Sequence, residues 1–474
     1  MLRTKLPVIA RGLTHAILLL LSLDGCAPAA STPAPQLVLL ISVDTLRADR
    51  LGVYGSELGI SPNIDAFAEH SQVFEAAYAP TSFTLPSIGT LLTGRYPEEI
   101  GLLGNRSALA PSVPTLATAL GESGWRSAAV VGNLVLRGNA GLAGGFDVYD
   151  DDLHDRESTR GWPERIARKT TDSALALLDG FPHDRDDRFF LWVHYQDPHG
   201  PYTPPEGLRE RFLEDERASE DGRRQLPEAS GHRGRGHIPH YQVVDEQREV
   251  AFYRAGYDGE IHYLDAELGR LLAVLDEREL TQRSVVVFTA DHGESLGEHG
   301  YWFAHGDRLD EALVRVPLLL RVPGLAPARR YDIAGLVDIT PTLLQLATQR
   351  PVDPDAPGRD LLASDARAID SVPYLATLGA GGPARFGIVA EGHKFVMTRS
   401  DHGWQQELYR LGDEGSNRAD SDPERVRRLR ERLVALRRGL QPSAPIRRQK
   451  LSEQDQQNLR SLGYIQAPET THSD

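Results

Sequence analysis

The sequence predicts an α/β protein built on a doubly wound, mostly parallel β-sheet. Short, continuous apolar runs alternate along the chain with longer segments in which apolar residues recur every three or four positions. The runs are typical of strands buried on both faces, and the longer segments are typical of amphipathic helices. Strands that alternate with helices favour a sheet covered by helices on both faces. Ligand sites of such sheets lie beyond the carboxyl ends of the strands.

Four apolar runs are the expected strands: residues 37–43, 127–131, 189–193 and 284–288. Helical periodicity predicts helices over three segments: residues 112–123, 169–178 and 260–275. Residues 203–250 interrupt the alternation, because they are rich in Arg, Glu, Gly and Pro. We expect a solvated surface excursion there, as is usual for such a composition. The alternative is that this segment lies over the pocket and selects substrates, and the sequence leaves both open.

A second, smaller domain is expected after residue 350. A Pro-rich linker occupies residues 351–357, and short strand candidates follow at 386–389 and 394–397. An Arg-rich stretch with helical periodicity covers residues 423–440. We therefore predict a catalytic domain over residues 37–350 and a small α+β C-terminal domain over residues 351–474, ending in the run 462–464.

The N-terminus has the layout of a secretory signal peptide. Basic residues precede the apolar run 16–21, which is too short to span a membrane as a mature helix. The run Leu-Asp-Gly-Cys that ends at Cys26 resembles a lipobox. We predict a signal peptide over residues 1–26, lipidation of Cys26 and a tether over residues 27–36. The protein would then be an exported lipoprotein, periplasmic or anchored to the outer membrane. Ordinary secretion with an incidental cysteine is the alternative.

Composition excludes one class of partner. The 474 residues carry 52 Lys and Arg against 67 Asp and Glu, a net charge of -15. Nucleic acids need a basic face, so we expect no nucleic-acid partner. Because Cys26 is the only cysteine, the mature chain holds no internal disulfide.

Carboxylates follow the ends of two predicted strands. Asp44 follows the run 37–43, and Asp291 with His292 comes shortly after the run 284–288. A carboxylate at the end of a buried strand is costly unless it is paired or bound to a metal. Neighbouring Asp and His side chains are a frequent metal-ligand pair. We therefore expect these three side chains to meet in a metal site at one edge of the sheet.

Further candidate residues follow other elements. Thr84 precedes a predicted helix that ends near Gly94. Its plain interpretation is a helix N-cap, and its functional interpretation is a hydroxyl at the positive end of a helix, well placed for an anionic ester. Asp197 and His199 follow a third strand, and His305 precedes a glycine. Singly these residues are weak evidence, but together in one crevice they indicate a site.

The order of these segments resembles the sulfatases of the alkaline phosphatase superfamily. The resemblance includes D-T-L-R-A-D-R-L-G-V-Y-G at 44–55, T-L-P-S-I-G-T-L-L-T-G-R-Y-P at 84–97 and F-T-A-D-H-G-E-S-L-G-E-H-G at 288–300. It extends over nearly the whole mature chain. It implies the same doubly wound α/β fold and metal-dependent hydrolysis of an ester.

The chain departs from the family pattern at the reactive positions. Thr84 stands where sulfatases carry the Cys or Ser that is oxidised to formylglycine, so no formylglycine is expected, and Ile88 replaces an arginine. The family's G-K-W-H element is not visible, and residues 131–134 take its place. Thr45 stands where many members have a second metal-binding Asp, and His305 takes the place of a lysine.

The remaining residues match the site of threonine-using relatives: nucleotide pyrophosphatases/phosphodiesterases, lipoteichoic acid synthases and phosphoethanolamine transferases. By this resemblance, Asp44, Thr84, Asp291 and His292 hold a divalent metal and Thr84 is the nucleophile. A histidine in place of the usual Asn, together with a threonine oxygen, favours zinc or manganese, with calcium as the alternative.

Two histidines have alternative roles. His199 and His305 are candidates for contacting the anionic oxygens of the substrate or for protonating the leaving group. With Asp197 they could instead hold a second metal, as in the two-zinc relatives.

Three functions remain open. The overall resemblance favours hydrolysis of a sulfate ester carried by an extracytoplasmic small-molecule, glycan or lipid substrate, with Thr84 as nucleophile. The site residues favour a phosphodiesterase or phosphotransferase that uses Thr84 on a phosphate ester. The third is a catalytically inactive domain that binds an anionic ligand, and retention of the whole metal set argues against it. We expect the first.

Overall fold

The computed structural model describes residues 1, 35–153, 163–180, 187–227, 234–353, 355–363, 372–378 and 382–461. The predicted signal peptide, Cys26, most of the tether and the run 462–464 lie outside these residues. Ala34–Asp474 forms one compact unit, within which the boundary at residue 350 stays a prediction. Over the described ranges, no helix combines the length and the apolar character needed to cross a bilayer.

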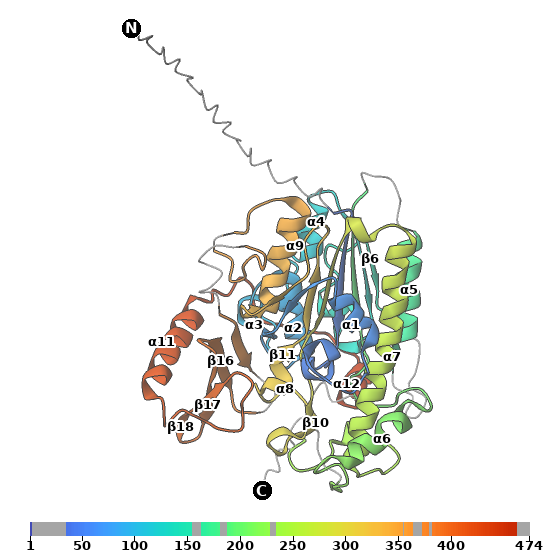
Figure 1. Cartoon of the computed structure of the whole chain (residues 1–474). Coiled ribbons are helices and arrows are strands. Elements are labelled where there is room, and N and C mark those ends of the chain that lie inside the picture. Colours follow the sequence, from blue (N-terminus) through green and yellow to red (C-terminus); the bar gives the residue numbers. More distant parts are fainter. Residues whose placement is uncertain are drawn as a thin grey trace. The chain divides into compact units, whose positions relative to one another are not determined.

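An eight-stranded sheet lies at the centre of the fold (Figure 1). Its strand order is β13-β2-β12-β8-β1-β7-β5-β6. The four predicted strands are confirmed: β1 (Leu37–Val43), β5 (Arg126–Val131), β7 (Phe189–Tyr195) and β8 (Ser284–Ala290). The other members are β2 (Gln72–Phe74), β6 (Val148–Asp150), β12 (Leu318–Arg321) and β13 (Ala328–Arg330). β12 is antiparallel to β8 and β2, and the remaining pairs are parallel, so the predicted mostly parallel sheet is confirmed.

The central strand β1 carries the chain from its entry point to the site. It pairs in parallel with β7 on one side and β8 on the other over its whole length. Every residue of β1 is buried, as expected for a continuous apolar run covered on both faces. Gln36, just before it, donates its backbone N–H to Arg283, at the amino edge of the sheet. Asp44 follows at the opposite edge.

Helices cover both faces of the sheet (Figure 1). One face carries α1 (Pro62–Ala68), α5 (Ala167–Asp179) and α7 (Val250–Glu277). The other carries α2 (Thr84–Thr93), α4 (Leu116–Gly121) and α9 (Ile339–Thr348). Shorter elements complete this part: α3 (Pro97–Ile100), α8 (Glu311–Val314), β3 (Ala77–Tyr78), β4 (Ser107–Ala108), β9 (Ser295–Leu296), β10 (Trp302–Ala304), β11 (Arg315–Val316) and β14 (Ala334–Gly335).

Two helices differ from their predicted ranges. α4 begins at Leu116 rather than at residue 112, because Thr115 caps it and accepts a hydrogen bond from the Thr118 N–H. α7 begins at Val250 rather than at residue 260. Its first turns pack against α6 (Leu208–Ala218) and are buried on more than one side, which hides the periodicity that would mark them in sequence.

The expected solvated excursion over residues 203–250 is confirmed only in part: most of its described residues are exposed or half-buried, but a minority are buried. The segment contains α6, and six of its described apolar residues are buried: Phe212, Leu226, Ile238, Tyr241, Val244 and Val250. These residues are scattered among charged ones, so no periodicity announces them. Their burial ties the segment to the main core and brings Tyr241 next to the candidate site.

A small antiparallel sheet with a helix forms the C-terminal region, as predicted. Its strands are β15 (Tyr374–Thr377), β16 (Arg385–Ala390), β17 (His393–Ser400) and β18 (Gly403–Arg410). α11 (Pro423–Gly439) packs on it through Leu429 and Leu433. The chain then returns to the larger part, where β19 (Arg447–Arg448) pairs with β4 and α12 (Glu453–Ser461) places Leu459 in the main core.

Core packing predicts a large loss of stability for Leu40→Ala. Leu40 is fully buried in β1, between Trp192 of β7 and Val287 of β8. Removing its side chain leaves a cavity, so the free energy of unfolding should fall by about 2–5 kcal/mol. Urea unfolding measures this change. Leu325→Ala is the matched control, since Leu325 is 41% exposed; a similar loss in both variants would contradict the prediction.

Candidate active site

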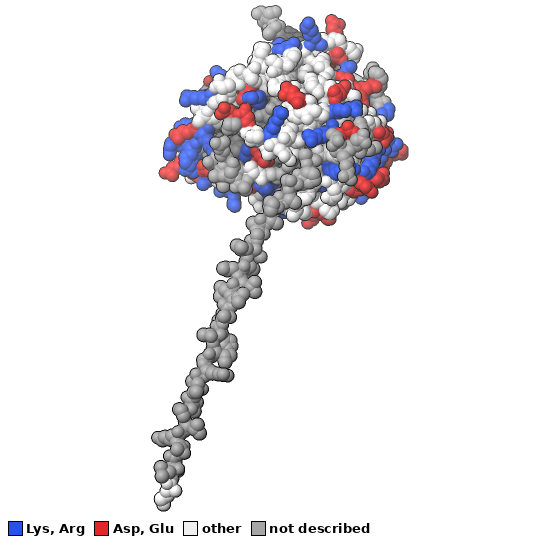
Figure 2. All heavy atoms as spheres, turned by 90° about the horizontal axis from the view of Figure 1, so that it is seen from above, with Lys and Arg blue, Asp and Glu red and all other residues white. Residues whose placement is uncertain are grey.

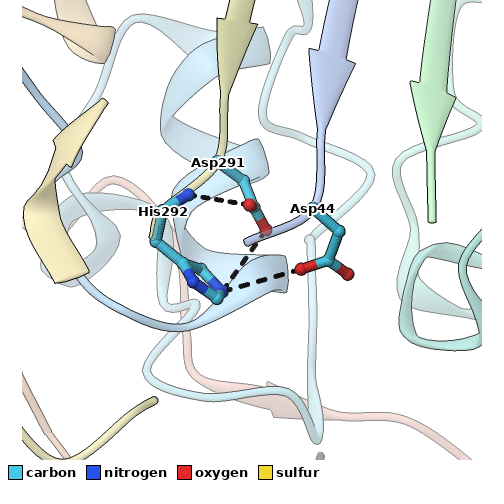
Figure 3. A group of neighbouring side chains, drawn as sticks. All are labelled: Asp44, Asp291 and His292. Atoms are coloured by element: carbon cyan, nitrogen blue, oxygen red, sulfur yellow. Dashed lines mark hydrogen bonds and ion pairs between the residues drawn. The ribbon is translucent and has the colours of Figure 1, made fainter. Parts of the chain in front are cut away.

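Two carboxylates leave adjacent strands at the same level (Figure 3). Val43 of β1 lies opposite Ala290 of β8, so Asp44 and Asp291 follow in register. Backbone hydrogen bonds continue the sheet by one residue: Asp44 N–H donates to Tyr195 at 3.0 Å, and Asp291 N–H donates to Val43 at 3.1 Å. Both side chains are fully buried. The structure therefore brings these two carboxylates together, as the sequence predicts.

His292 completes a three-residue cluster with them. The ligand atoms of Asp44, Asp291 and His292 all lie within 4.8 Å of one another. His292 Nδ1 lies 2.9 Å from the Gly293 carbonyl oxygen, which can only accept, so Nδ1 carries the hydrogen. Its other nitrogen, Nε2, therefore presents a lone pair 3.4 Å from Asp291 Oδ2 and 4.0 Å from Asp44 Oδ1 (Figure 3).

This cluster fits a divalent cation. Burial raises the pKa of the Asp291 carboxyl, as expected for a carboxylate taken out of water. Thr45, in a left-handed conformation (φ 55°), donates its N–H to Asp291 Oδ1. Its own hydroxyl is buried and has no hydrogen-bond partner among the described residues. Carboxylate oxygens with one imidazole nitrogen are a ligand set suited to zinc or manganese.

Asn133 contacts the cluster from the segment that stands in place of the family's Lys- and His-bearing element. Its side-chain amide donates to Asp44 Oδ2, and its Oδ1 accepts from the Val135 N–H at 2.8 Å. Partners of this kind orient a ligating carboxylate. The sequence marked residues 131–134 as the stretch in place of that element, but it did not predict this contact, which joins residues 89 positions apart.

Thr84 faces the cluster from the start of α2. The N-cap of this helix is Phe83, and Thr84 makes no capping hydrogen bond, so the plain N-cap interpretation is wrong. Instead, Thr84 Oγ1 lies 3.3 Å from His292 Nε2. Ser87, one turn later, donates its hydroxyl to the Asp291 carbonyl at 2.6 Å and fixes the helix against the end of β8. The side chain of Thr84 is fully buried.

His199 and His305 lie beside the cluster. The ring centroid of His305 is 4.7 Å from that of His292 and 5.1 Å from that of His199. His199 Nδ1 lies 2.7 Å from the Gly200 carbonyl oxygen, so its Nε2 is the unprotonated nitrogen of the neutral ring. Burial lowers the pKa of both imidazoles, and the neighbouring histidine side chains lower it further.

Asp197 is not brought together with these two histidines. Among the described residues, no metal-ligand group contains Asp197, His199 and His305. The Asp197 carboxyl interacts with Glu260 on α7 and with the backbone of Ala167 on α5, and burial raises its pKa to about 6. The Asp197 carboxyl therefore faces α5 and α7, which cover one face of the sheet. The expected second metal set finds no support in this geometry.

Comparison of the sequence with known proteins identifies the family. Residues 36–349 match the family model described as Sulfatase. The chain belongs to the sulfatase family. Human iduronate 2-sulfatase is 30% identical over 422 residues, covering 72% of this chain and 75% of that protein. The choline-sulfatase of Rhizobium meliloti is 25% identical over 346 residues, with 65% and 67% covered.

Solved structures show the fold of this sulfatase. A protein in complex with its substrate D-glucosamine-2-N,6-O-disulfate superposes with a TM-score of 0.68 at 18% identity, covering 86% of this chain and 98% of that chain. The phosphonate monoester hydrolase of Agrobacterium radiobacter gives 0.67 at 20% identity, covering 86% and 96%. The alkaline phosphatase superfamily fold is thus confirmed, and membership of the family makes the protein an ester-bond hydrolase.

Besides the role of Asn133, two further residues near the site were missed from the sequence. Glu294 is fully buried, and its Oε1 lies 3.2 Å from His305 Nδ1. Burial raises the pKa of its carboxyl to about 8. Tyr241 stacks near His199 with 6.4 Å between ring centroids. The signal for Glu294 was its place in the D-H-G-E run after β8, where side chains of the site gather. Tyr241 had no such signal.

Proposed function

We propose that this sulfatase-family protein hydrolyses a sulfate ester of an extracytoplasmic substrate, with Thr84 as the nucleophile. One observation carries the proposal: the Thr84 hydroxyl, at the N-terminus of α2, lies 3.3 Å from a His292 nitrogen whose lone pair faces it. The buried carboxylates of Asp44 and Asp291 lie 4.0 and 3.4 Å from the same nitrogen. A hydroxyl in this setting is prepared for attack on an anionic ester held at the helix terminus.

A divalent cation, zinc or manganese, would be held by Asp44, Asp291, His292 and Thr84. Bound there, it would lower the pKa of the Thr84 hydroxyl and would offset charge on the transferred group. The chain's own groups do the rest. Thr84 forms the covalent ester, and the N-terminal end of α2 attracts the ester's negative charge. The rings of His199 and His305 lie beside the cluster, and either ring can contact the ester oxygens or give a proton to the leaving oxygen when its Nε2 carries a hydrogen.

A phosphate ester is the second candidate. Thr84 takes the place of the formylglycine residue, and a threonine ester is released by water or by an acceptor hydroxyl, as in phosphodiesterases and phosphotransferases. The likeness in fold to a phosphonate monoester hydrolase is compatible with this function. A catalytically inactive domain that binds an anionic ligand is the third candidate, and the intact cluster around Thr84 speaks against it.

We also propose that the protein is exported and anchored by lipidation of Cys26, in the periplasm or at the outer membrane. The basic and apolar N-terminal run followed by Leu-Asp-Gly-Cys supports this localisation. Mass spectrometry of protein extracted from membranes would identify acylation of Cys26, and unmodified protein in the soluble fraction would contradict it.

The test of the ester type is a paired assay on residues 27–474. The protein is stripped of metal, resupplied with zinc, manganese or calcium, and given an aryl sulfate, an aryl phosphate monoester and an aryl phosphodiester. Hydrolysis of the sulfate that is lost in Thr84→Ala supports the proposal. Thr84-dependent hydrolysis of the phosphodiester alone selects the second candidate. Tight binding of an anionic glycan without turnover of any ester selects the third.

Metal removal is expected to lower the melting temperature of the wild-type protein. Without the ion, two buried carboxylates remain close together, and an ion that binds only the folded state stabilises it by about 2.7 kcal/mol when present at 100 times its Kd. Thermal unfolding of chelated protein, titrated with each ion, measures the effect. Zinc or manganese should stabilise more than calcium. Stabilisation by calcium alone would overturn the assignment of the ion.

A further inference from the structure

A buried carboxyl group outside the metal cluster contacts one of the candidate histidines. Glu294 Oε1 lies 3.2 Å from His305 Nδ1, and the two side chains are 0% and 4% exposed. The His305 ring is itself placed between the rings of His292 and His199. Because Glu294 occupies Nδ1, the ring nitrogen left to face the reacting groups is Nε2. This holds whichever of the two partners carries the shared hydrogen.

The Glu294 carboxyl is in turn held from several sides. Tyr202, Tyr241 and Tyr257, from three separate segments, lie close enough for their hydroxyls to interact electrostatically with it. Arg47 donates from Nη1 to the Glu294 backbone carbonyl at 3.1 Å. The Glu294 side chain is fully buried, so the atoms packed around it restrict its rotation. Its direction, and with it the plane of the His305 ring, is fixed by the fold.

We propose that Glu294 is the positioning residue for His305, holding the ring so that Nε2 meets the leaving oxygen of the bound ester. The inference rests on the proposed function and deepens it. An imidazole that is free to rotate offers Nε2 in the productive direction only part of the time. A hydrogen-bonded partner on the other nitrogen removes that freedom, and a group that orients a catalytic imidazole in this way recurs in unrelated enzymes.

A double-mutant cycle on kcat tests the proposal. Glu294→Leu keeps the side-chain bulk and removes the hydrogen bond, Glu294→Gln keeps a hydrogen-bonding group, and His305→Ala removes the partner. We expect Glu294→Leu to lower kcat on the order of 10²-fold with KM nearly unchanged, and Glu294→Gln to recover part of the loss. In the His305→Ala background, Glu294→Leu should cause no further loss. Equal losses in both backgrounds would overturn the proposal, because a merely structural role does not depend on His305.

A second measurement does not depend on turnover. Spectra of ¹⁵N-histidine-labelled protein, with His305 assigned from its loss in His305→Ala, should show a hydrogen-bonded Nδ1 that disappears in Glu294→Leu and persists in Thr84→Ala. Unchanged His305 signals in Glu294→Leu would refute the positioning role even if every ester assay failed. Glu298→Gln, in the same loop, is the matched control, since Glu298 pairs with Arg47 and not with a histidine. It should leave both readouts unaltered.

Discussion

Thr84→Ala should lower kcat on the ester substrate by on the order of 10⁴-fold or more, because it removes the attacking oxygen itself. The remaining rate would come from binding and electrostatic stabilisation alone. The variant should fold normally, since Thr84 makes no capping hydrogen bond and the helix is fixed by Ser87. Steady-state rates with metal supplied in excess measure the loss, and unfolding curves measure the stability.

Thr84→Ser is the matched control for that substitution. It keeps a hydroxyl at the same position relative to His292 Nε2, and we expect it to retain much of the wild-type rate. Mass spectrometry of acid-quenched protein should find the transferred group attached to Thr84 in the wild type and to Ser in the control. Full activity in Thr84→Ala would mean that another group attacks the ester and that the assignment of Thr84 as the nucleophile is wrong.

Asp291→Asn should abolish metal-dependent turnover and, at neutral pH, raise the stability of the metal-free protein by about 1 kcal/mol or more. Burial raises the folded-state pKa of this carboxyl above its unfolded value. Its contribution to stability is therefore full below the unfolded pKa and is lost as the pH rises through the folded pKa. An amide of the same shape carries no charge to bury. Its NH₂ can donate to the lone pair of His292 Nε2, now 3.4 Å from Asp291 Oδ2.

Asp338→Asn separates this effect from a general property of buried carboxyls. Asp338 is also buried, and its pKa is raised to about 6, but its two oxygens accept backbone hydrogen bonds from Gly335 and Arg359 at 2.9 Å each. An amide cannot accept at both positions, so this variant should lose stability and keep its metal response. Thermal unfolding with and without zinc or manganese compares the two. A metal-free Asp291→Asn protein less stable than wild type would contradict the prediction.

The strands and the metal cluster could be predicted from the sequence because both depend on local patterns. Continuous apolar runs mark β1 and β8, and parallel strands place the residues that follow them at one edge. Asp44, Asp291 and His292 are therefore brought together by register alone. Placing Thr84 near the cluster also required the start of α2 to be predicted, and the glycine that ends this helix was visible in the sequence.

The surroundings of the cluster could not be predicted, since they depend on contacts between distant segments. Asn133 reaches Asp44 across 89 residues, and Tyr241 comes from a charged segment whose few apolar residues show no period. The direction of the Asp197 side chain could not be predicted either. Its position after β7 suited a ligand, but the carboxyl faces Glu260 instead. Proximity along a strand end fixes which edge a residue occupies and leaves open which way its side chain turns.

The strand β1 separates the point where the chain enters the fold from the candidate site. The chain enters the fold at one edge of the sheet and reaches Asp44 at the other, so β1 alone separates entry point and site by about 20 Å. If Cys26 is acylated as proposed, the anchored segment joins the sheet at the edge opposite Asp44, so tethering would not require the candidate site to lie against the bilayer.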